Sequence, residues 1–184
     1  MKSKRTIRVG LCFVYLLASV AASALSTDKE QPIEIEADFA EIDDRAGVAI
    51  YKGDVVATQG SIRLTGDTLT IRFTDDDELN EVLLEGEPAR FRQRPDDRDV
   101  DTIGEARRIE YHSLDESLLL IENAKVTQGG KLFLGHRIDY DTKRNVLRAR
   151  KADQGETMPS GEQVAPDAGR IRMILPPEKK QEER

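Results

Sequence analysis

The chain has 184 residues and carries 28 Lys and Arg against 35 Asp and Glu, which gives a formal net charge of −7. This acidic balance argues against nucleic acid as a partner, because the phosphates would be repelled. With one cysteine, Cys12, and two histidines, the chain also offers little for a metal centre, and we expect neither a metal nor a cofactor.

Residues 1–24 predict a secretory signal peptide. Four cations precede an apolar run over residues 9–20, and Ala22-Ser23-Ala24 forms a small-x-small cleavage site. The apolar run is shorter than the roughly 20 residues that span a bilayer, which favours cleavage over the alternative of a retained membrane anchor. Cleavage would remove Cys12 and leave 24 Lys and Arg against 35 acidic residues, a net charge of −11.

The sequence of the exported chain predicts a succession of strands and contains no segment of helical periodicity. Residues 25–31 are polar and are expected to be loose, the strand pattern loosens again over 89–101, and residues 152–169 predict a flexible loop rich in Gly and Pro. The charged tail 178–184 is expected to be disordered, which leaves one folded domain over 25–177. The predicted strands cover 33–36, 48–59, 62–64, 69–73, 82–84, 103–112, 118–128, 132–134, 138–140, 146–149 and 170–175.

A short sequence motif occurs four times along this domain. The segment 66–71 is echoed by 37–42, 106–111 and 135–140, and each copy ends in alternating polar and apolar residues. In chain order, each of the first three copies is followed by a second predicted strand, which completes the pair. A repeat of about thirty to forty residues, built from a pair of strands, predicts a stacked all-β body with a long interior. Such a body has no need of a catalytic pocket.

The apolar residues of the repeats project to one face of the predicted strands. One interpretation is an ordinary closed core, which is the commoner outcome for such a face. The other is an open apolar surface for aliphatic chains, which the absence of Trp and the aromatic content of 5% favour, because few large side chains are available to fill a thick core. The residues on this face are Leu69, Ile71, Ile109, Tyr111, Ile138 and Tyr140, extended by Ile33, Ile35 and Phe91.

The charged residues offer alternatives that we judge weaker. Asp75–Glu78 lacks the glycine and the ligand spacing of an EF-hand and predicts a solvated hairpin tip. His112 and His136 are predicted to be surface or rim histidines, because no carboxylate partner is evident in the sequence. The arginines between 90 and 108 either meet phosphate groups at a groove mouth or form a solvated loop balanced by nearby aspartates. No pair of carboxylates stands out as glycosidase machinery, so we expect no catalytic residue.

Two segments resemble a known family. Residues 31–38, QPIEIEAD, and residues 51–60, YKGDVVATQG, resemble the opening of the LptA (OstA-like) family of periplasmic lipopolysaccharide-transport proteins. The resemblance continues through 66–67, 88–91, 106–111 and 169–176, so it covers nearly all of the exported chain in order. This sequence departs from the family in the more charged loop Arg90–Asp101 and in the longer loop 152–169.

The resemblance implies an all-β fold, namely an open, twisted antiparallel β-jellyroll built from repeated strand pairs. It also implies a non-enzymatic periplasmic carrier that bridges inner-membrane and outer-membrane components and holds lipopolysaccharide with its acyl chains in an apolar groove. Ile33, Phe91 and Tyr111 match the family's lipid contacts. Together with the apolar face described above, the predicted lipid-binding residues are Ile33, Ile35, Leu69, Ile71, Phe91, Ile109, Tyr111, Ile138 and Tyr140.

The resemblance further implies that copies join end to end, and join related domains of an inner-membrane and an outer-membrane partner. An open sheet leaves unpaired N–H and C=O groups on its first and last strands, which another chain can extend. The predicted edge residues are Ile33, Glu34, Ile35, Ile171, Met173 and Leu175. Two alternatives stay open: the periplasmic domain of the related inner-membrane partner, which would keep its N-terminal anchor, and a polysaccharide-active β-solenoid enzyme.

Overall fold

The computed structural model describes residues 27–95, 99–144, 146–151 and 170–176. Within these ranges the chain forms ten strands and one short 3-10 turn, η1 (Thr27–Glu30), and no α-helix, so the predicted all-β class is confirmed. No helix in the described ranges has the length and hydrophobicity needed to cross a membrane. The strands are β1 (Glu34–Glu36), β2 (Phe39–Asp43), β3 (Val48–Gln59), β4 (Ile62–Phe73), β5 (Leu79–Gln93), β6 (Thr102–His112), β7 (Ser117–Gln128), β8 (Lys131–Asp141), β9 (Val146–Arg150) and β10 (Arg172–Ile174).

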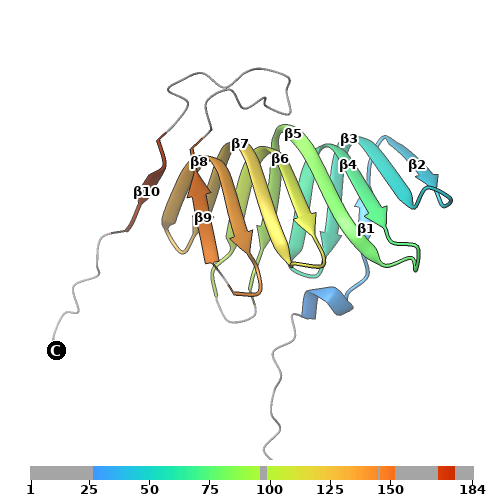
Figure 1. The fold of residues 1–184 in the computed structure, drawn as a ribbon, viewed down its shortest axis with the longest axis horizontal. Coiled ribbons are helices and arrows are strands. Elements are labelled where there is room, and N and C mark those ends of the chain that lie inside the picture. Colours follow the sequence, from blue (N-terminus) through green and yellow to red (C-terminus); the bar gives the residue numbers. More distant parts are fainter. Residues whose placement is uncertain (1–26, 96–98, 145, 152–169, 177–184) are drawn as a thin grey trace, which may run out of the picture.

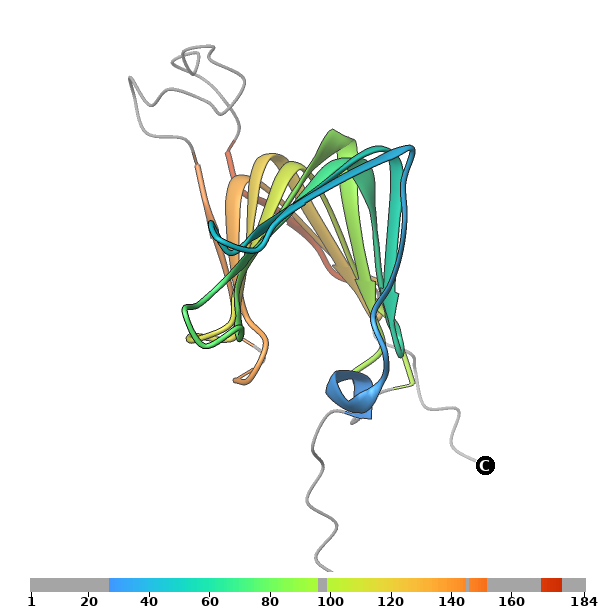
Figure 2. The ribbon, with the colours of Figure 1, turned by 90° about the vertical axis from the view of Figure 1, so that its right-hand side faces the viewer.

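All ten strands belong to one antiparallel sheet that is folded into an arch. The sheet order is β1-β3-β4-β5-β6-β7-β8-β10, while β2 also pairs with β3 and β9 with β8. Seen end-on, the strands rise on one side, bend at a common apex and descend on the other side, so that the arch is open below (Figure 2). Along the molecule the strands follow one another nearly in chain order (Figure 1). The sheet does not close on itself, which confirms the expected open architecture.

The six long strands, β3 to β8, each run through both sides of the arch. The pairing of β3 with β4 shifts register between Lys52 and Val55, and that of β7 with β8 shifts between Ile121 and Ala124. Both stretches contain residues with positive φ. Extra residues of this kind bend a strand and increase its local twist, and a line of them along the apex folds the sheet over.

The bend divides the sheet into two walls. We call the side that carries β1 and β10 the β1 wall, and the side that carries β2 and β9 the β2 wall. Strand β1 pairs with the second half of β3, over Val56–Thr58, whereas β2 pairs with its first half, over Val48–Lys52. At the other end, β10 and β9 divide β8 between them in the same way.

The core lies between the walls and is built from two unequal rows near the apex. On the β2 wall, one lateral row of directly opposed residues contributes large side chains: Tyr51, Leu69, Leu84, Ile109, Leu120 and Ile138. On the β1 wall, the residues beside the apex are small: Val55, Gly66, Ala89, Ala106, Ala124 and Gly135. A Cβ built on Gly66 would lie 2.8 Å from Leu84 Cδ1, and one on Gly104 would lie 2.9 Å from Leu120 Cδ2. Large residues of one wall therefore fill space that small residues of the other wall leave.

Two sequence-based predictions about loose segments were wrong. Residues 27–30 form η1, and the buried Asp28 carboxylate accepts hydrogen bonds from the Ser61 amide (2.6 Å) and hydroxyl (2.7 Å). The pattern does not loosen at residue 89, because β5 continues to Gln93 with Ala89 and Phe91 buried. In that stretch the arginines alternate with the buried residues, so they are the outward side of a strand.

The predicted pairs of short strands at 62–73 and 132–140 are each one long strand, β4 and β8, bent at the apex. The predicted hairpin tip at 75–78 is confirmed, with the Asp77 amide donating to the Thr74 carbonyl at 3.0 Å. The predicted signal peptide, the loop 152–169 and the tail 178–184 lie outside the described residues.

Candidate functional site

The inner surface of the arch carries the hydrophobic core cluster of the described part of the chain. Six of the nine predicted lipid-binding residues lie in its buried core: Leu69, Ile71, Phe91, Ile109, Ile138 and Tyr140. Ile35 and Tyr111 are partly buried and pack against this core. The structure thus brings eight of the nine residues into one interior.

Ile33 is the exception among the predicted lipid-binding residues. It precedes β1 and is 55% exposed, and it does not belong to the packed interior. Sequence reasoning also missed Leu84 and Leu120, which are 1% and 0% exposed at the centre of the large row. Their signal was weak, because the outward residues beside them, Leu83 and Leu119, are also apolar, so polar and apolar residues do not alternate in these stretches.

Burial is highest near the apex of the arch and mixed toward its open mouth. Near the apex, Leu120 and Ile138 are completely buried in the isolated chain. Closer to the mouth, apolar side chains of both walls are only partly buried: Ile62, Leu64, Leu79, Val82, Tyr111, Phe133 and Leu147. The upper interior is therefore a closed core, as the first interpretation of the pattern held. In the lower interior, buried residues such as Phe91, Leu118 and Tyr140 lie beside partly accessible apolar side chains, so the second interpretation holds there only in part.

The inward row at the mouth of the β1 wall is largely polar. It contains Gln59, Ile62, Gln93, Thr102, Gln128 and Lys131, which follow one another across successive strands. The Gln128 amide donates to the Thr102 hydroxyl at 2.9 Å, and the Gln93 amide donates to Asp28 at 3.3 Å. The interior thus changes from apolar at the apex to hydrogen-bonding at the mouth, as a site for an amphipathic molecule requires.

The outer face of the sheet is charged, with opposite signs placed opposite one another. Glu105 pairs with Arg90 at 3.6 Å and with Lys125 at 3.1 Å on the β1 wall. Arg92 and Arg94 both hold Asp101, at 2.6 and 2.8 Å. The hydrogen bonds from Arg94 and then Arg92 lower the pKa of the half-buried Asp101 carboxyl. These contacts agree with the interpretation of the arginines as ion-paired surface residues, although Arg90 and Arg92 lie on a strand and not in a loop.

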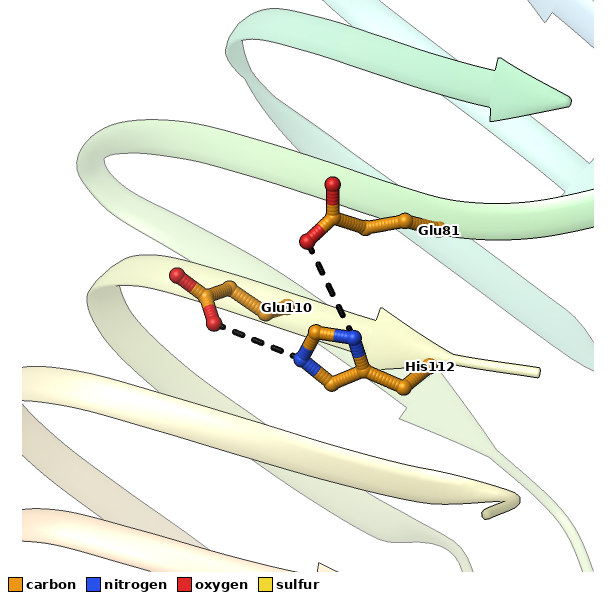
Figure 3. Close-up of side chains that lie close together, drawn as sticks. All are labelled: Glu81, Glu110 and His112. Carbon is orange, nitrogen blue, oxygen red and sulfur yellow. Dashed lines mark ion pairs between the residues drawn. The ribbon is translucent and has the colours of Figure 1, made fainter. Parts of the chain in front are cut away.

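One cluster on the outer face has the composition of a metal site (Figure 3). His112 Nδ1 lies 3.7 Å from Glu81, and His112 Nε2 lies 3.5 Å from Glu110. Each carboxylate is already engaged by an arginine, Arg72 at 3.1 Å from Glu81 and Arg108 at 2.6 Å from Glu110. The arginines neutralise the charge that would attract a cation, so the cluster is a cross-strand ion-pair network.

The predictions for the two histidines therefore need correction. His112 does have carboxylate neighbours: Glu110 is two residues away on the same face of β6, and Glu81 lies directly opposite on β5. The spacing of Glu110 and His112 was a usable signal, whereas Glu81 is brought there only by strand pairing. His136 is 7% exposed and is not a surface residue.

The two ends of the arch are open sheet edges. At one end β1 and β2 each pair on one side only, with β3, and at the other end β10 and β9 pair only with β8. Of the predicted edge residues, Glu34, Ile35 and Met173 lie within β1 and β10, while Ile33, Ile171 and Leu175 flank these strands. Ile33, Ile171, Met173 and Leu175 are exposed apolar side chains.

Comparison with known proteins gives consistent matches. Residues 34–146 match the family model described as LptA/(LptD N-terminal domain) LPS transport protein. The chain is 42% identical to the lipopolysaccharide export system protein LptH of Pseudomonas aeruginosa over 165 residues, 89% of this chain and 90% of that protein. It is 30% identical to LptA of Escherichia coli K12 over 149 residues, 80% of each chain.

A solved structure supports the same relationship. The crystal structure of LptH from Pseudomonas aeruginosa, described as the LptA-homologous periplasmic component of the lipopolysaccharide transport device, superimposes with a TM-score of 0.71. The similarity covers 82% of this chain and 99% of that chain, at 40% sequence identity. The resemblance noted in the sequence is therefore confirmed.

Proposed function

Because the chain belongs to the LptA/LptD N-terminal-domain family of lipopolysaccharide transport proteins, we propose that it carries lipopolysaccharide through the periplasm with the acyl chains inside the arch. The observation that supports this placement is the gradient inside the arch, from buried aliphatic residues at the apex to a polar row at the mouth. Acyl chains would lie against the partly buried apolar residues, and the phosphates and sugars would stay beside the polar row.

The energetics favour acyl burial over charge as the source of affinity. Each buried CH₂ contributes about 0.8 kcal/mol, so ten contribute about 8 kcal/mol before ordering costs. Repulsion between exposed charges about 4 Å apart in water is about 1 kcal/mol, and salt screens it beyond roughly 8 Å. Since the apex residues are already in contact with each other, an acyl chain that enters deeply replaces existing contacts. The net affinity is therefore moderate, which suits a carrier that must release its lipid.

We also propose that the chain has no catalytic role of its own. The relatives it matches are export proteins. The carboxylates with the most suggestive geometry, Glu81 and Glu110, are each held by an arginine. On this proposal residues 1–24 are a cleaved signal peptide, and residues 25–177 form the periplasmic domain. Its open edges join further copies and the related domains of inner-membrane and outer-membrane partners.

In-cell photocrosslinking tests the placement of the lipid. Tyr111 is partly buried in the interior, and its neighbour His112 faces outward on the same strand, so a photoreactive phenylalanine analogue at each position forms a matched pair. We expect a lipopolysaccharide adduct from position 111 and none from position 112. Equal adducts from both positions, or none from position 111 in a folded and exported protein, would place the lipid elsewhere.

A further inference from the structure

The two ends of the arch carry charges of opposite sign, and neither end combines acidic with basic residues. Within residues 34–43, which form β1 and β2, five residues are acidic and none is basic. Within the described residues 146–151 and 170–176, which include β9 and β10, five residues are basic and none is acidic. The interior of the sheet mixes the two signs, so this separation belongs to the edges.

The lateral rows of the sheet connect these charges in a defined register. On the outer face of the β2 wall, the row of directly opposed residues that starts at Glu41 ends at Arg148. On the outer face of the β1 wall, the row that starts at Glu36 ends at Arg172. Among the described residues, none of these four charged side chains is engaged in an ion pair.

The same register also matches the apolar inner face. The inner row of the β1 wall starts at Ile35 and ends at Met173, and the mouth-side row of the β2 wall starts at Ile42 and ends at Leu147. A shift by one residue would place apolar residues opposite charged ones, because successive side chains alternate between the faces, whereas a shift by two would keep the faces and break the continuity of the rows.

Strand direction permits the ends to join. The path from β1 to β10 contains eight strands, and every neighbouring pair is antiparallel, so β1 and β10 run in opposite directions. If β10 of one copy lies beside β1 of another, the new pair is antiparallel like every other pair. Strand β9 then meets β2, and both walls continue from one copy into the next.

We infer that the edge charges select a second copy of this chain in one orientation, and that the uninterrupted rows of the sheet set its register, with Arg148 opposite Glu41 and Arg172 opposite Glu36. This rests on the end-to-end contact of the proposed function and adds what directs it. Two like ends would place acid against acid or base against base, and like charges directly opposed across strands are destabilising. The contact is heterologous and does not close, so it extends the arch in one direction.

Charge reversal tests the inference. Sedimentation velocity of the exported protein compares the wild type with two double variants, E36K/E41K and R148E/R172E. We expect each double variant alone to self-associate about tenfold more weakly, because two opposed pairs become repulsive. An equimolar mixture of the two variants should associate again, since each acidic edge then finds a basic one. The control D75K/D76K makes the same charge change as E36K/E41K, but at the β4–β5 hairpin, and should behave as the wild type.

Cysteine pairs test the register. Opposed residues in an antiparallel pair have Cα atoms about 4.5–5.5 Å apart, within the span of a disulfide. Mixing E36C protein with R172C protein under oxidation should give a crosslinked dimer, whereas E34C with R172C, displaced by two residues, should not. Equal crosslinking of both mixtures would overturn the register.

Double variants that associate as tightly as the wild type would overturn the role of charge and leave the end-to-end contact standing. A wild type that stays monomeric at all concentrations would overturn the inference as a whole. Lipopolysaccharide crosslinking at position 111 is read out separately, so either failure is distinguishable from failure of the carrier function.

Discussion

At the scale of single residues, the interior depends on large side chains of one wall meeting small residues of the other. Leu120 shows this, because it is completely buried and reaches the backbone of Gly104 on the opposite wall. The neighbours of such a residue relax only partly when it is truncated, so the loss includes both its transfer free energy and the cavity that remains.

Truncation of Leu120 should therefore lower the stability of the whole arch. We expect Leu120→Ala to reduce the free energy of unfolding by about 2–5 kcal/mol, measured by urea denaturation. Leu114→Ala is the matched control, because Leu114 is 88% exposed, and it should change stability by less than about 0.5 kcal/mol. Similar losses in the two variants would contradict the packing described for the apex.

Asp101 gives a prediction about pH. The arginines Arg94 and Arg92 lower the pKa of its carboxyl, so the native state favours the ionised form. The stabilisation is present above the pKa of the unfolded chain and is lost as the pH falls through the lower pKa of the folded protein. NMR titration of the Asp101 carboxyl carbon should report a pKa below the ordinary aspartate value of about 3.9, and Arg94→Gln should raise it. An unchanged titration in that variant would rule out the arginine as the cause.

At the scale of elements, the short edge strands differ from the long strands between them. Strand β10 has only three residues and pairs with β8 alone, so it adds little to the core, and its Met173 is exposed. A short, exposed edge strand is suited to being completed by another chain.

A charge at Met173 should separate assembly from folding. We expect Met173→Glu to weaken end-to-end association, because it places a carboxylate on the inner apolar row where the next copy would pack. The melting temperature should stay close to that of the wild type. Leu114→Glu, in the β6–β7 turn, serves as the control for an added charge, and both quantities are measured on the same samples. A large loss of thermal stability in Met173→Glu would show that β10 is part of the core.

At the scale of the whole molecule, the two proposed activities use different forces. Lipid binding in the arch depends on apolar burial, whereas end-to-end contact is directed by exposed charges, and salt screens exposed charges strongly. The two activities should respond to salt in different ways, even though they share one continuous sheet.

Raising the salt concentration from about 50 mM to about 500 mM should weaken self-association several-fold, because the Debye length falls to a few Å. Lipopolysaccharide binding, measured by fluorescence of an acyl-labelled lipid, should change much less over the same range. A lipid affinity that falls as steeply as self-association would indicate that charge, and not acyl burial, holds the lipid.

The sequence by itself determined the all-β class, the family and most of the interior. Period-two alternation and the repeated sequence motif identify which side chains share a face. Eight of the nine lipid-binding residues predicted in this way lie together in the arch. Alternation is a local property of the chain, so it can be read without knowledge of which strands pair. The same alternation was present at Ala89 and Phe91 and was hidden only by the arginines between and after them.

Only the tertiary structure decided what depends on pairing between distant strands. The bend at the apex, the contact of Leu120 with Gly104, the neighbourhood of His112 and Glu81, and the rows that end at Arg148 and Arg172 all arise from the register of one strand against another. Alternation in the sequence fixes only the face on which a side chain lies, whereas the residues it is opposed to depend also on the bulges and the packing along the whole sheet.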